Sequence, residues 1–297
     1  MTVTRTPKVS NCPNVVGEID LRSIHQVYYT SFVIFQSRLA LVKTTVDKAL
    51  ADFFIRKKQK AKKINPHCVA LVDQVESLTM RGGKRTRAFL CWLGAQGTKE
   101  TKIFKELQYA MMALELFHSF ALIHDDIIDE DTTRRGAPSV HEHFRINASK
   151  HFGTSMAILT GDLALVWADE LMGKAGEMSI YTQMKQEVIF GQSLDVMEEH
   201  MKIGISKQLI DVYKTAWYSV IRPLQIGAAI AGAGEKMLDS FIPYGLAVGQ
   251  AYQLRDDVLD GTITESDFMK QVKHLTIPRS ATPMLQAFAR FAIERNA

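Results

Sequence analysis

Three aspartates near the middle of the chain are spaced so that their side chains meet. Asp125, Asp126 and Asp129 form a D-D-x-x-D pattern within the segment ELFHSFALIHDDIIDED. On a helix, residues four apart share a face. Carboxylates this close repel one another unless a cation lies between them, and an oxygen-only ligand set suits Mg²⁺. The plainer alternative is a solvated acidic helix end, but the flanking apolar residues argue against a uniformly polar face.

A second cluster repeats the same spacing far downstream. Asp256, Asp257 and Asp260 lie in GQAYQLRDDVLDG, again among apolar residues. Each cluster ends a long apolar helix, and two such helices packed side by side would bring both clusters to one cavity mouth. Facing carboxylate walls of this kind form a site for several Mg²⁺ ions, which suits a diphosphate ligand.

Basic residues gather at three places that could complete such a site. In RGGKRTR a Gly-Gly pair separates two helices, and Lys84, Arg85 and Arg87 crowd the start of the second. Cations at a helix N-terminus are unfavourable unless they share an anion with it, so this segment predicts a phosphate site, although a solvated basic turn is the alternative. Arg134 and Arg135 directly follow the first aspartate cluster.

Two further polar residues interrupt apolar helices. Lys214, in VYKTAWYS, could neutralise a leaving diphosphate, or its stem could pack while its ammonium reaches solvent. His118 precedes the first aspartate cluster and has an equally plain interpretation as a buried, hydrogen-bonded histidine. The sequence alone leaves both alternatives open.

Helical periodicity runs along nearly the whole chain, and strand signals are nearly absent. The pattern predicts helices at about 22–57, 66–80, 84–97, 101–129, 149–174, 178–201, 206–231 and 235–260, and a short one at 284–294. The run RKKQKAKK is predicted to be a basic helix end and loop. We therefore expect an unstructured lead over 1–22 and a single all-helical domain over 23–297.

Composition excludes several classes of protein. The net charge of the 297 residues is +4, with no basic stripe carrying interleaved aromatics, so nucleic acid is not an expected partner. The three cysteines are odd in number and form no C-x-x-C, which argues against a disulfide framework or zinc site and favours a reducing, cytoplasmic compartment. We expect neither a signal peptide nor a transmembrane segment.

Several motifs occur in a telling order. GGKRTR, DDIID followed by RRG, GQSLD, YKTA and GQAYQLRDDVLD together resemble the trans-type isoprenyl diphosphate synthases, the polyprenyl synthetase family. The resemblance runs from about Asn65 to Asp260. It implies the all-α isoprenoid synthase fold, in which one large helical bundle surrounds a central cavity, and it implies a homodimer.

The resemblance also implies roles for individual residues. About three Mg²⁺ ions per active site would be held by the two aspartate motifs: Asp125, Asp126, Asp129, Asp256, Asp257 and Asp260. The diphosphate of isopentenyl diphosphate would contact Lys84, Arg87, His118 and Arg135. The allylic diphosphate or its developing charge would contact Arg134, Lys214, Thr215 and Gln253. Gln192 and Asp195 would line the cavity. The first motif, Lys214 and Asp256 would be catalytic.

The expected reaction is Mg²⁺-dependent condensation of isopentenyl diphosphate with dimethylallyl, geranyl or farnesyl diphosphate. Phe120 and Phe117 precede the first motif by five and eight residues, and the small Ala121 follows Phe120. One aromatic at this place resembles archaeal-type geranylgeranyl diphosphate synthases, so we expect a C20 product, with C15 as the alternative. Both phenylalanines could also be ordinary core residues.

The sequence departs from the family pattern after Asp260. It lacks the usual Gly-Lys pair and is expected to be shortened at its C-terminal end, which affects the lid over the allylic site. A non-catalytic subunit of a heteromeric synthase is therefore an alternative, which the intact aspartates oppose. A terpene cyclase would need neither the second D-D-x-x-D nor a basic site for a second diphosphate.

Overall fold

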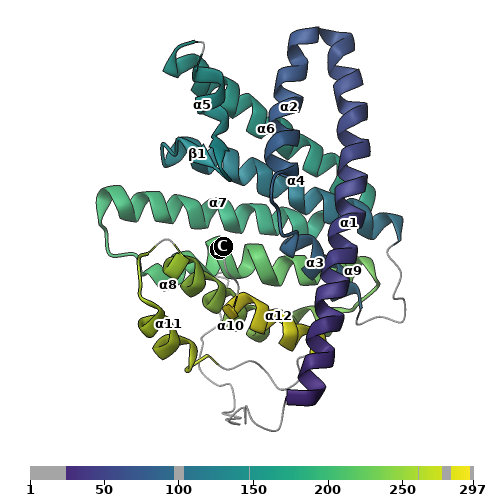
Figure 1. Ribbon diagram of the computed structural model, residues 1–297, viewed down its shortest axis with the longest axis vertical. Coiled ribbons are helices and arrows are strands. Elements are labelled where there is room, and N and C mark those ends of the chain that lie inside the picture. The colour runs from purple at the N-terminus through teal and green to yellow at the C-terminus, as the bar shows by residue number, and fades with distance from the viewer. Residues whose placement is uncertain (1–24, 97–103, 147, 260, 276–281, 295–297) are drawn as a thin grey trace, which may run out of the picture.

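The chain forms a bundle of helices in the computed structural model (Figure 1). The structure describes residues 25–96, 104–146, 148–259, 261–275 and 282–294, so the lead expected over 1–22 lies outside it. Within these ranges the only strands are two residues long and pair as a hairpin. The all-α isoprenoid synthase class expected from the sequence is thereby confirmed in its helical content.

The elements follow one another with short connections. Their bounds in chain order are α1 (His25–Ile64), the 3₁₀ turn η1 (Pro66–Cys68), α2 (Val69–Met80), α3 (Thr86–Ala95), α4 (Lys105–Ile128), β1 (Thr133–Arg134), β2 (Ala137–Pro138), α5 (Val140–Arg145), α6 (Lys150–Ala175), α7 (Met178–Met201), α8 (Lys207–Asp211), the π-helix η2 (Val212–Ile221), α9 (Arg222–Ile230), α10 (Glu235–Leu259), α11 (Glu265–Val272) and α12 (Pro283–Glu294).

The basic run RKKQKAKK is helical to Ile64, so the predicted loop is wrong. Lys58 in this run forms ion pairs with Asp73, at 2.8 Å, and with Glu76, both on the neighbouring α2. Acidic partners on the next helix offset the repulsion between neighbouring cations. Asn65 then accepts a hydrogen bond from the His67 amide and caps the 3₁₀ turn that reverses the chain.

The segment predicted as one helix over 206–231 is three consecutive pieces, α8, η2 and α9. The middle piece has π-helical hydrogen bonding, which side-chain periodicity does not reveal. The short helices α5 and α11 and the β1–β2 hairpin were also not predicted, because elements of two to eight residues carry too little periodicity.

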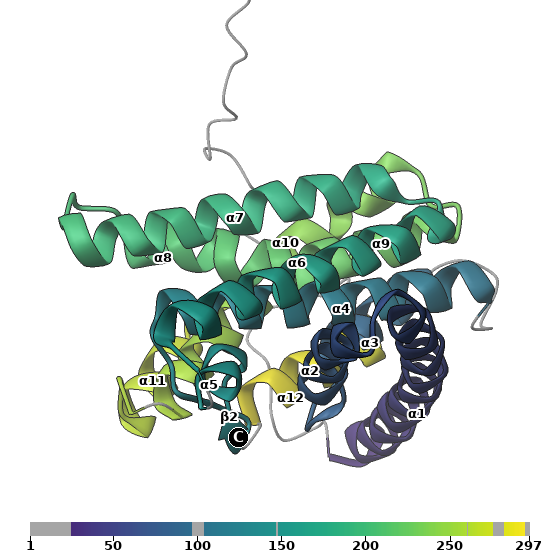
Figure 2. The same ribbon diagram turned by 90° about the horizontal axis from the view of Figure 1, so that it is seen from above.

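Helix α4 runs through the centre of the bundle and packs on α6, α3 and α9 (Figure 2). Most of its side chains from Leu107 to Ile123 are buried. An aromatic cluster joins the outer elements, because the ring of Phe35 on α1 contacts Phe89 on α3 and Phe288 on α12. The C-terminal helix is therefore part of the core.

Two glycines allow α3 and α9 to touch along their backbones. A Cβ atom added to Gly94 on α3 would overlap the carbonyl oxygen of Leu224 on α9. Conversely, a Cβ atom on Gly227 would overlap the carbonyl oxygen of Cys91. Each helix thus supplies a glycine where the other's backbone lies against it, and no larger residue fits at either place.

Within the described residues, no helix is both long and apolar enough to span a lipid bilayer.

Candidate active site

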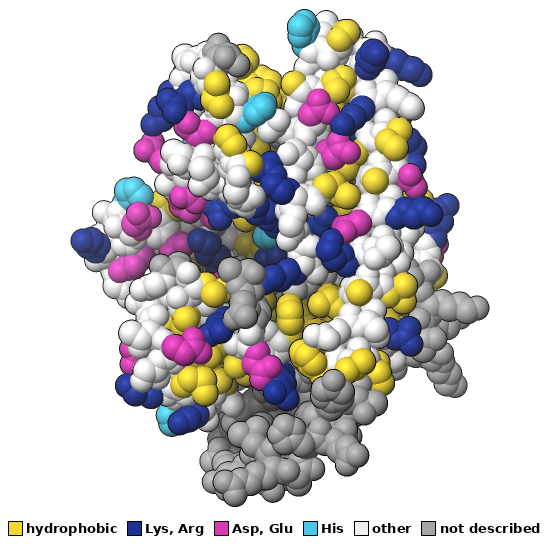
Figure 3. Space-filling view, in the orientation of Figure 1, with side chains coloured by type: hydrophobic (Ala, Val, Ile, Leu, Met, Phe, Trp, Pro, Cys, Tyr) yellow, Lys and Arg dark blue, Asp and Glu magenta, His cyan; other side chains and the backbone are white. Residues whose placement is uncertain are grey.

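Four elements bring the predicted polar residues to one side of the bundle. The C-terminal end of α4 carries the first aspartate motif, α7 carries Asp195, η2 carries Lys214 and Thr215, and α10 carries the second motif. Figure 3 shows that the surface is hollowed on this face, between the hairpin and α8, and that Lys and Arg side chains gather around the hollow. The fold thus gathers residues that lie more than a hundred positions apart in sequence.

The ammonium group of Lys214 lies between two carboxylates. It donates to Asp195 at 2.5 Å and is 3.9 Å from Asp125. Burial alone would lower the pKa of Lys214, but these carboxylates outweigh burial and raise it. Lys214 is therefore a firmly charged cation beside the first aspartate motif, and it does not extend away into solvent.

Asp126 and Asp129 are held in a strained electrostatic state. Asp126 is 1% exposed; one of its oxygens accepts from Arg134 at 2.5 Å, and the other, Oδ2, has no hydrogen-bond partner among the described residues. Burial, followed by the charges of Asp131 and Asp125, raises the pKa of Asp126 to about 6 despite Arg134. Burial and the charge of Asp125 likewise raise the pKa of Asp129 to about 6.

A chain of hydrogen bonds links η2 to the second motif. Thr215 donates to the amide oxygen of Gln253 at 2.9 Å, and the amide nitrogen of Gln253 donates to Asp257 at 3.0 Å. Asp257 also pairs with Lys207 of α8 at 3.1 Å. Asp256 is half-buried on the next position of α10. Asp260, the last predicted ligand of this motif, lies outside the described residues.

Arg87 and His118 meet around a single tyrosine. The guanidinium of Arg87 stacks 4.3 Å from the ring centre of Tyr218 and donates to Ser219 at 2.8 Å. The Nδ1 atom of His118 is 3.1 Å from the Tyr218 hydroxyl. Burial, together with the charges of Arg87 and Arg135, lowers the pKa of His118 well below its usual value. His118 is therefore neutral, which leaves the arginines to carry the positive charge.

The β1–β2 hairpin positions the two consecutive arginines differently. Arg134 points to the carboxylates of Asp126 and Asp131. Arg135 has a left-handed backbone, with φ of 53°, and donates to the carbonyls of Leu78 and Arg81 at 2.9 Å each. This pair of carbonyl contacts fixes Arg135 beside the segment that precedes α3 and carries Lys84.

Arg85 has a structural environment, unlike the neighbouring cations with which the sequence grouped it. It is 2% exposed and donates to Asp47 at 2.7 Å and to Glu115 at 3.1 Å. Its own backbone is left-handed, with φ of 57°, directly before α3. Glu115 also accepts from the Ala88 amide at the start of that helix. Both carboxylates are used by Arg85, so its charge is not available to an anion.

A sequence model of the polyprenyl synthetase family matches residues 69–295, most of the chain and all of the elements described above. The chain belongs to this family. Its enzyme class is accordingly that of the prenyltransferases, as the motifs predicted.

Individual relatives agree with the family assignment. A farnesyl diphosphate synthase of Haemophilus influenzae is 30% identical over 84% of this chain and 85% of its own length. A geranylgeranyl diphosphate synthase of Methanosarcina mazei is 33% identical over 62% of this chain, and the match spans 56% of that relative. The relatives therefore include enzymes of both product lengths.

A solved structure supports the same fold. The geranylgeranyl pyrophosphate synthase of Corynebacterium glutamicum, solved with isoprenyl diphosphate and magnesium, superimposes with a TM-score of 0.72. It is 26% identical in sequence, and the match covers 87% of this chain and 99% of that one. Short-chain prenyl diphosphate synthesis is the activity that these likenesses support.

The aspartates of this polyprenyl synthetase fit a divalent cation, although no three acidic, histidine or cysteine side chains of the described residues converge to form a metal site. The fit rests on the unpartnered Oδ2 of Asp126 and on the repulsion between Asp125 and Asp129. A cation would supply the missing partner and relieve the repulsion. The protein's own cations, Lys214 and Arg134, contact these carboxylates instead.

Several residues that complete the site were missed in the sequence. Lys207 and Tyr218 contact predicted residues that lie 50 and 100 positions away. Asp47 and Glu115, which hold Arg85, belong to helices whose spacing gives no hint of a shared partner. A Lys or Tyr in a helical segment carries no local signal for such long-range contacts, and only the packing of the helices reveals them.

The two phenylalanines before the first motif lie in different surroundings. Phe117 is fully buried and contacts the rings of Tyr181 on α7 and Tyr218 on η2 at 5.9 and 5.6 Å. Phe120 is half-buried, contacts Phe117, and packs at 4.7 Å on His124 of its own helix. Phe117 is the phenylalanine that faces the elements carrying Asp195 and Lys214.

Proposed function

We propose that this chain is a Mg²⁺-dependent synthase that condenses isopentenyl diphosphate with an allylic diphosphate and releases geranylgeranyl diphosphate. One observation carries the proposal. The two aspartate motifs are joined through η2, because Lys214 contacts Asp125 while the adjacent Thr215 leads through Gln253 to Asp257. A diphosphate beside Lys214 would lie between the two acidic helices, where only a bridging cation allows it to bind.

The proposed metal ligands are the aspartates of both motifs, Asp125, Asp126, Asp129, Asp256, Asp257 and Asp260. Bound Mg²⁺ supplies charge neutralisation and polarises the bond to the leaving diphosphate. The magnesium in the Corynebacterium glutamicum structure supports the choice of ion. A set of about three ions, as the resemblance implies, belongs to this proposal.

The chain's own residues would perform the rest of the first step. Lys214 and Arg134 donate to the diphosphate as its carbon–oxygen bond breaks, and they stabilise the charge that develops on it. The allylic cation that remains faces buried aromatic rings, including Phe117 and Tyr218, which exclude water from the reacting carbon. Water exclusion prevents the cation from being captured as an alcohol.

In the second step the other substrate attacks that cation. Lys84, Arg87 and Arg135 would hold the diphosphate of isopentenyl diphosphate, and neutral His118, anchored on Tyr218, would donate or accept one hydrogen bond. The double bond attacks the cationic carbon and forms the new carbon–carbon bond. Loss of a proton then restores a double bond. The released diphosphate is the proposed acceptor of that proton, because none of the motif side chains is a suitable base.

The proposed C20 product follows from where the growing tail would stop. Helix rise places Phe120 and Phe117 about 7.5 and 12 Å from Asp125 along α4. The contacts of Phe117 with Tyr181 and Tyr218 would close the space between α4, α7 and η2. A C15 product is the alternative, since the relatives include a farnesyl diphosphate synthase.

A homodimer in a reducing, cytoplasmic compartment completes the proposal. Large apolar side chains are exposed along α6 and α7, including Val166 at 60% and Phe190 at 66%. Apolar surface of this kind on two adjacent helices is typical of an interface between subunits. Cys68 and Cys91 are free thiols, which suits a reducing compartment.

Turnover by the single purified protein tests the proposal. With Mg²⁺, isopentenyl diphosphate and farnesyl diphosphate, the chain alone should release diphosphate and a longer prenyl product. Asp125→Ala and Asp256→Ala should each reduce turnover on the order of 10²-fold or more and leave the circular dichroism spectrum unchanged. Turnover that requires a second protein would favour the non-catalytic subunit, and near-normal turnover of either variant at saturating Mg²⁺ would refute the metal assignment.

A further inference from the structure

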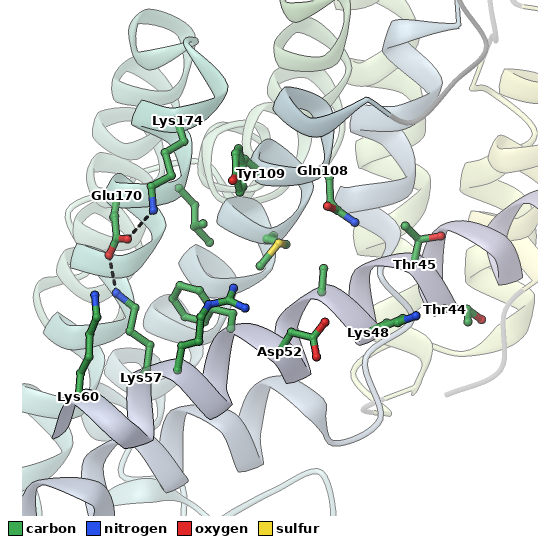
Figure 4. Close-up of a pocket in the computed structure, with 15 residues that line it drawn as sticks. Thr44, Thr45, Lys48, Asp52, Lys57, Lys60, Gln108, Tyr109, Glu170 and Lys174 are labelled. Atoms are coloured by element: carbon green, nitrogen blue, oxygen red, sulfur yellow. Dashed lines mark hydrogen bonds and ion pairs between the residues drawn. The ribbon is translucent and has the colours of Figure 1, made fainter. Parts of the chain in front are cut away.

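A pocket of about 780 Å³ lies between α1, α4 and α6, away from the aspartate motifs (Figure 4). Its walls come from residues 44–60 of α1, 108–112 of α4 and 170–174 of α6. None of the candidate active-site residues lines it. The proposed reaction therefore leaves this pocket without a role.

The floor of the pocket is apolar. Phe53, Met112 and Leu171 line it, and each is at least nine-tenths buried. The ammonium of Lys57 lies 4.9 Å from the centre of the Phe53 ring and 5.2 Å from that of Trp167. An apolar group could contact this floor without displacing any hydrogen-bonded side chain.

The rim of the pocket carries an excess of positive charge. Five cations and two carboxylates line it: Lys48, Arg56, Lys57, Lys60, Lys174, Asp52 and Glu170. Figure 4 shows Lys57 and Lys174 directed at the same carboxylate, Glu170, from α1 and α6. Because two cations already neutralise Glu170, the remaining three outnumber Asp52.

Those three cations have no ion-pair partner in the described part of the chain. Lys48, Arg56 and Lys60 are exposed and stand on one stripe of α1, four or eight residues apart. Like charges four residues apart on a helix repel each other. An anion in the pocket would relieve this repulsion, and a doubly or triply charged anion matches the excess better than a carboxylate does.

We propose that this pocket is a second, non-catalytic binding site for a phosphate or diphosphate ester that carries an apolar chain. The phosphate group lies among Lys48, Arg56 and Lys60, and the first part of the chain covers Phe53 and Met112. The site needs no metal ion, because its own side chains supply the positive charge. A soluble prenyl diphosphate and the headgroup of an anionic lipid share this chemistry.

Calorimetric titration with geranylgeranyl diphosphate in EDTA tests the site, since chelation removes the cations that the aspartate motifs need. The informative variant is Arg56→Glu with Lys60→Glu. The matched control is Arg38→Glu with Lys236→Glu, which makes the same change of charge at exposed helix positions outside the pocket. The pocket variant should bind about tenfold more weakly than the wild type, and the control should bind like the wild type.

Three further probes separate the parts and the source of the ligand. Inorganic diphosphate and geranylgeraniol should each bind more weakly than geranylgeranyl diphosphate, because each offers only one half of the ligand. Co-sedimentation with vesicles of phosphatidylcholine containing phosphatidic acid tests a lipid source. Vesicle binding lost only in the pocket variant, without binding of the soluble ester, would assign the site to a lipid headgroup.

Two results would overturn the proposal. In the first, the pocket variant binds both the ester and the vesicles as the wild type does. In the second, the pocket variant and the control lose binding equally, which would indicate attraction by overall charge. Condensation activity should be unchanged in the pocket variant, so failure of this proposal and failure of the proposed function are separate outcomes.

Discussion

At the scale of single residues, the aspartates of the first motif combine burial with mutual repulsion. Asp126 and Asp129 both have a pKa raised to about 6 in the metal-free protein, above the value of about 3.9 for a free aspartate. A raised pKa means that folding favours the protonated acid. These two groups therefore oppose folding above pH 6, and that penalty is relieved as the pH falls through 6 toward 4.

The same shift predicts how metal binding depends on pH. A cation requires the deprotonated carboxylates, so protons compete with Mg²⁺ as the pH falls through about 6. The Mg²⁺ concentration that gives half-maximal turnover should rise by about tenfold between pH 7 and pH 5. Turnover titrations with Mg²⁺ at fixed pH values measure it. A half-maximal concentration that stays constant over this range would contradict the shifted pKa values.

Residue spacing predicted the members of the candidate site better than their partners. The D-D-x-x-D patterns could be read because residues four apart on one helix are neighbours whatever the fold. The two partners of Lys214, Asp125 and Asp195, are on different helices, so spacing could show neither contact. Arg85 was grouped with anion-binding cations because charge is visible in a sequence, whereas the buried carboxylates that use it are not.

At the scale of elements, the turn before α3 depends on a buried network of charges. Arg85 holds a left-handed backbone there while it pairs with Asp47 on α1 and Glu115 on α4. The network thereby fixes the segment that carries Lys84 and Arg87. The strength of this anchor comes from burial, because a charge left unpaired inside the protein is costly.

Glu115→Gln should therefore lower the free energy of unfolding by about 3 kcal/mol, since it removes one charge of a buried pair. The matched control is Lys150→Gln, whose pair with Glu130 is mostly exposed, and it should change stability by less than about 1 kcal/mol. Urea unfolding followed by circular dichroism measures both. Equal effects of the two substitutions would show that the buried network does not anchor the turn.

The aromatic contacts of α4 predict where the product chain stops. Phe120→Ala and Phe117→Ala should each lengthen the product, because each removes a ring beside the space that the tail would fill. The control is Phe152→Ala on α6, which removes an exposed ring and should leave the product unchanged. Chromatography of the dephosphorylated products decides the outcome. An unchanged product from both α4 variants would assign the floor to another helix.

Elements were predicted well where they are long and amphipathic and poorly where another helix determines them. The expected ends of α2 and α7 agree with the structure because their own periodicity and flanking residues define them. The basic end of α1 stayed helical through ion pairs that only α2 could supply. The π-helix η2 shows the same limit, since its hydrogen-bond register leaves no mark on composition.

At the scale of the whole molecule, the apolar side chains exposed on α6 and α7 predict a dimer in solution. Val166→Asp with Phe190→Asp should convert the dimer to a monomer, because two charges would be buried without partners in the interface. Met269→Asp on α11 is the control, since that methionine is similarly exposed on another element. Sedimentation velocity distinguishes the two masses. A wild type that sediments as a monomer would disprove the predicted dimer.

The backbone contact between α3 and α9 has a consequence for the spacing of the two substrates. Arg87 lies at the start of α3, and α9 continues directly from η2, which carries Lys214. Because Gly94 and Gly227 leave no gap between these helices, the two diphosphate sites are parts of one rigid frame. The distance between the two headgroups is then a constant of the protein, the same in every round of elongation. Only the hydrocarbon tail has to find new room as the product grows.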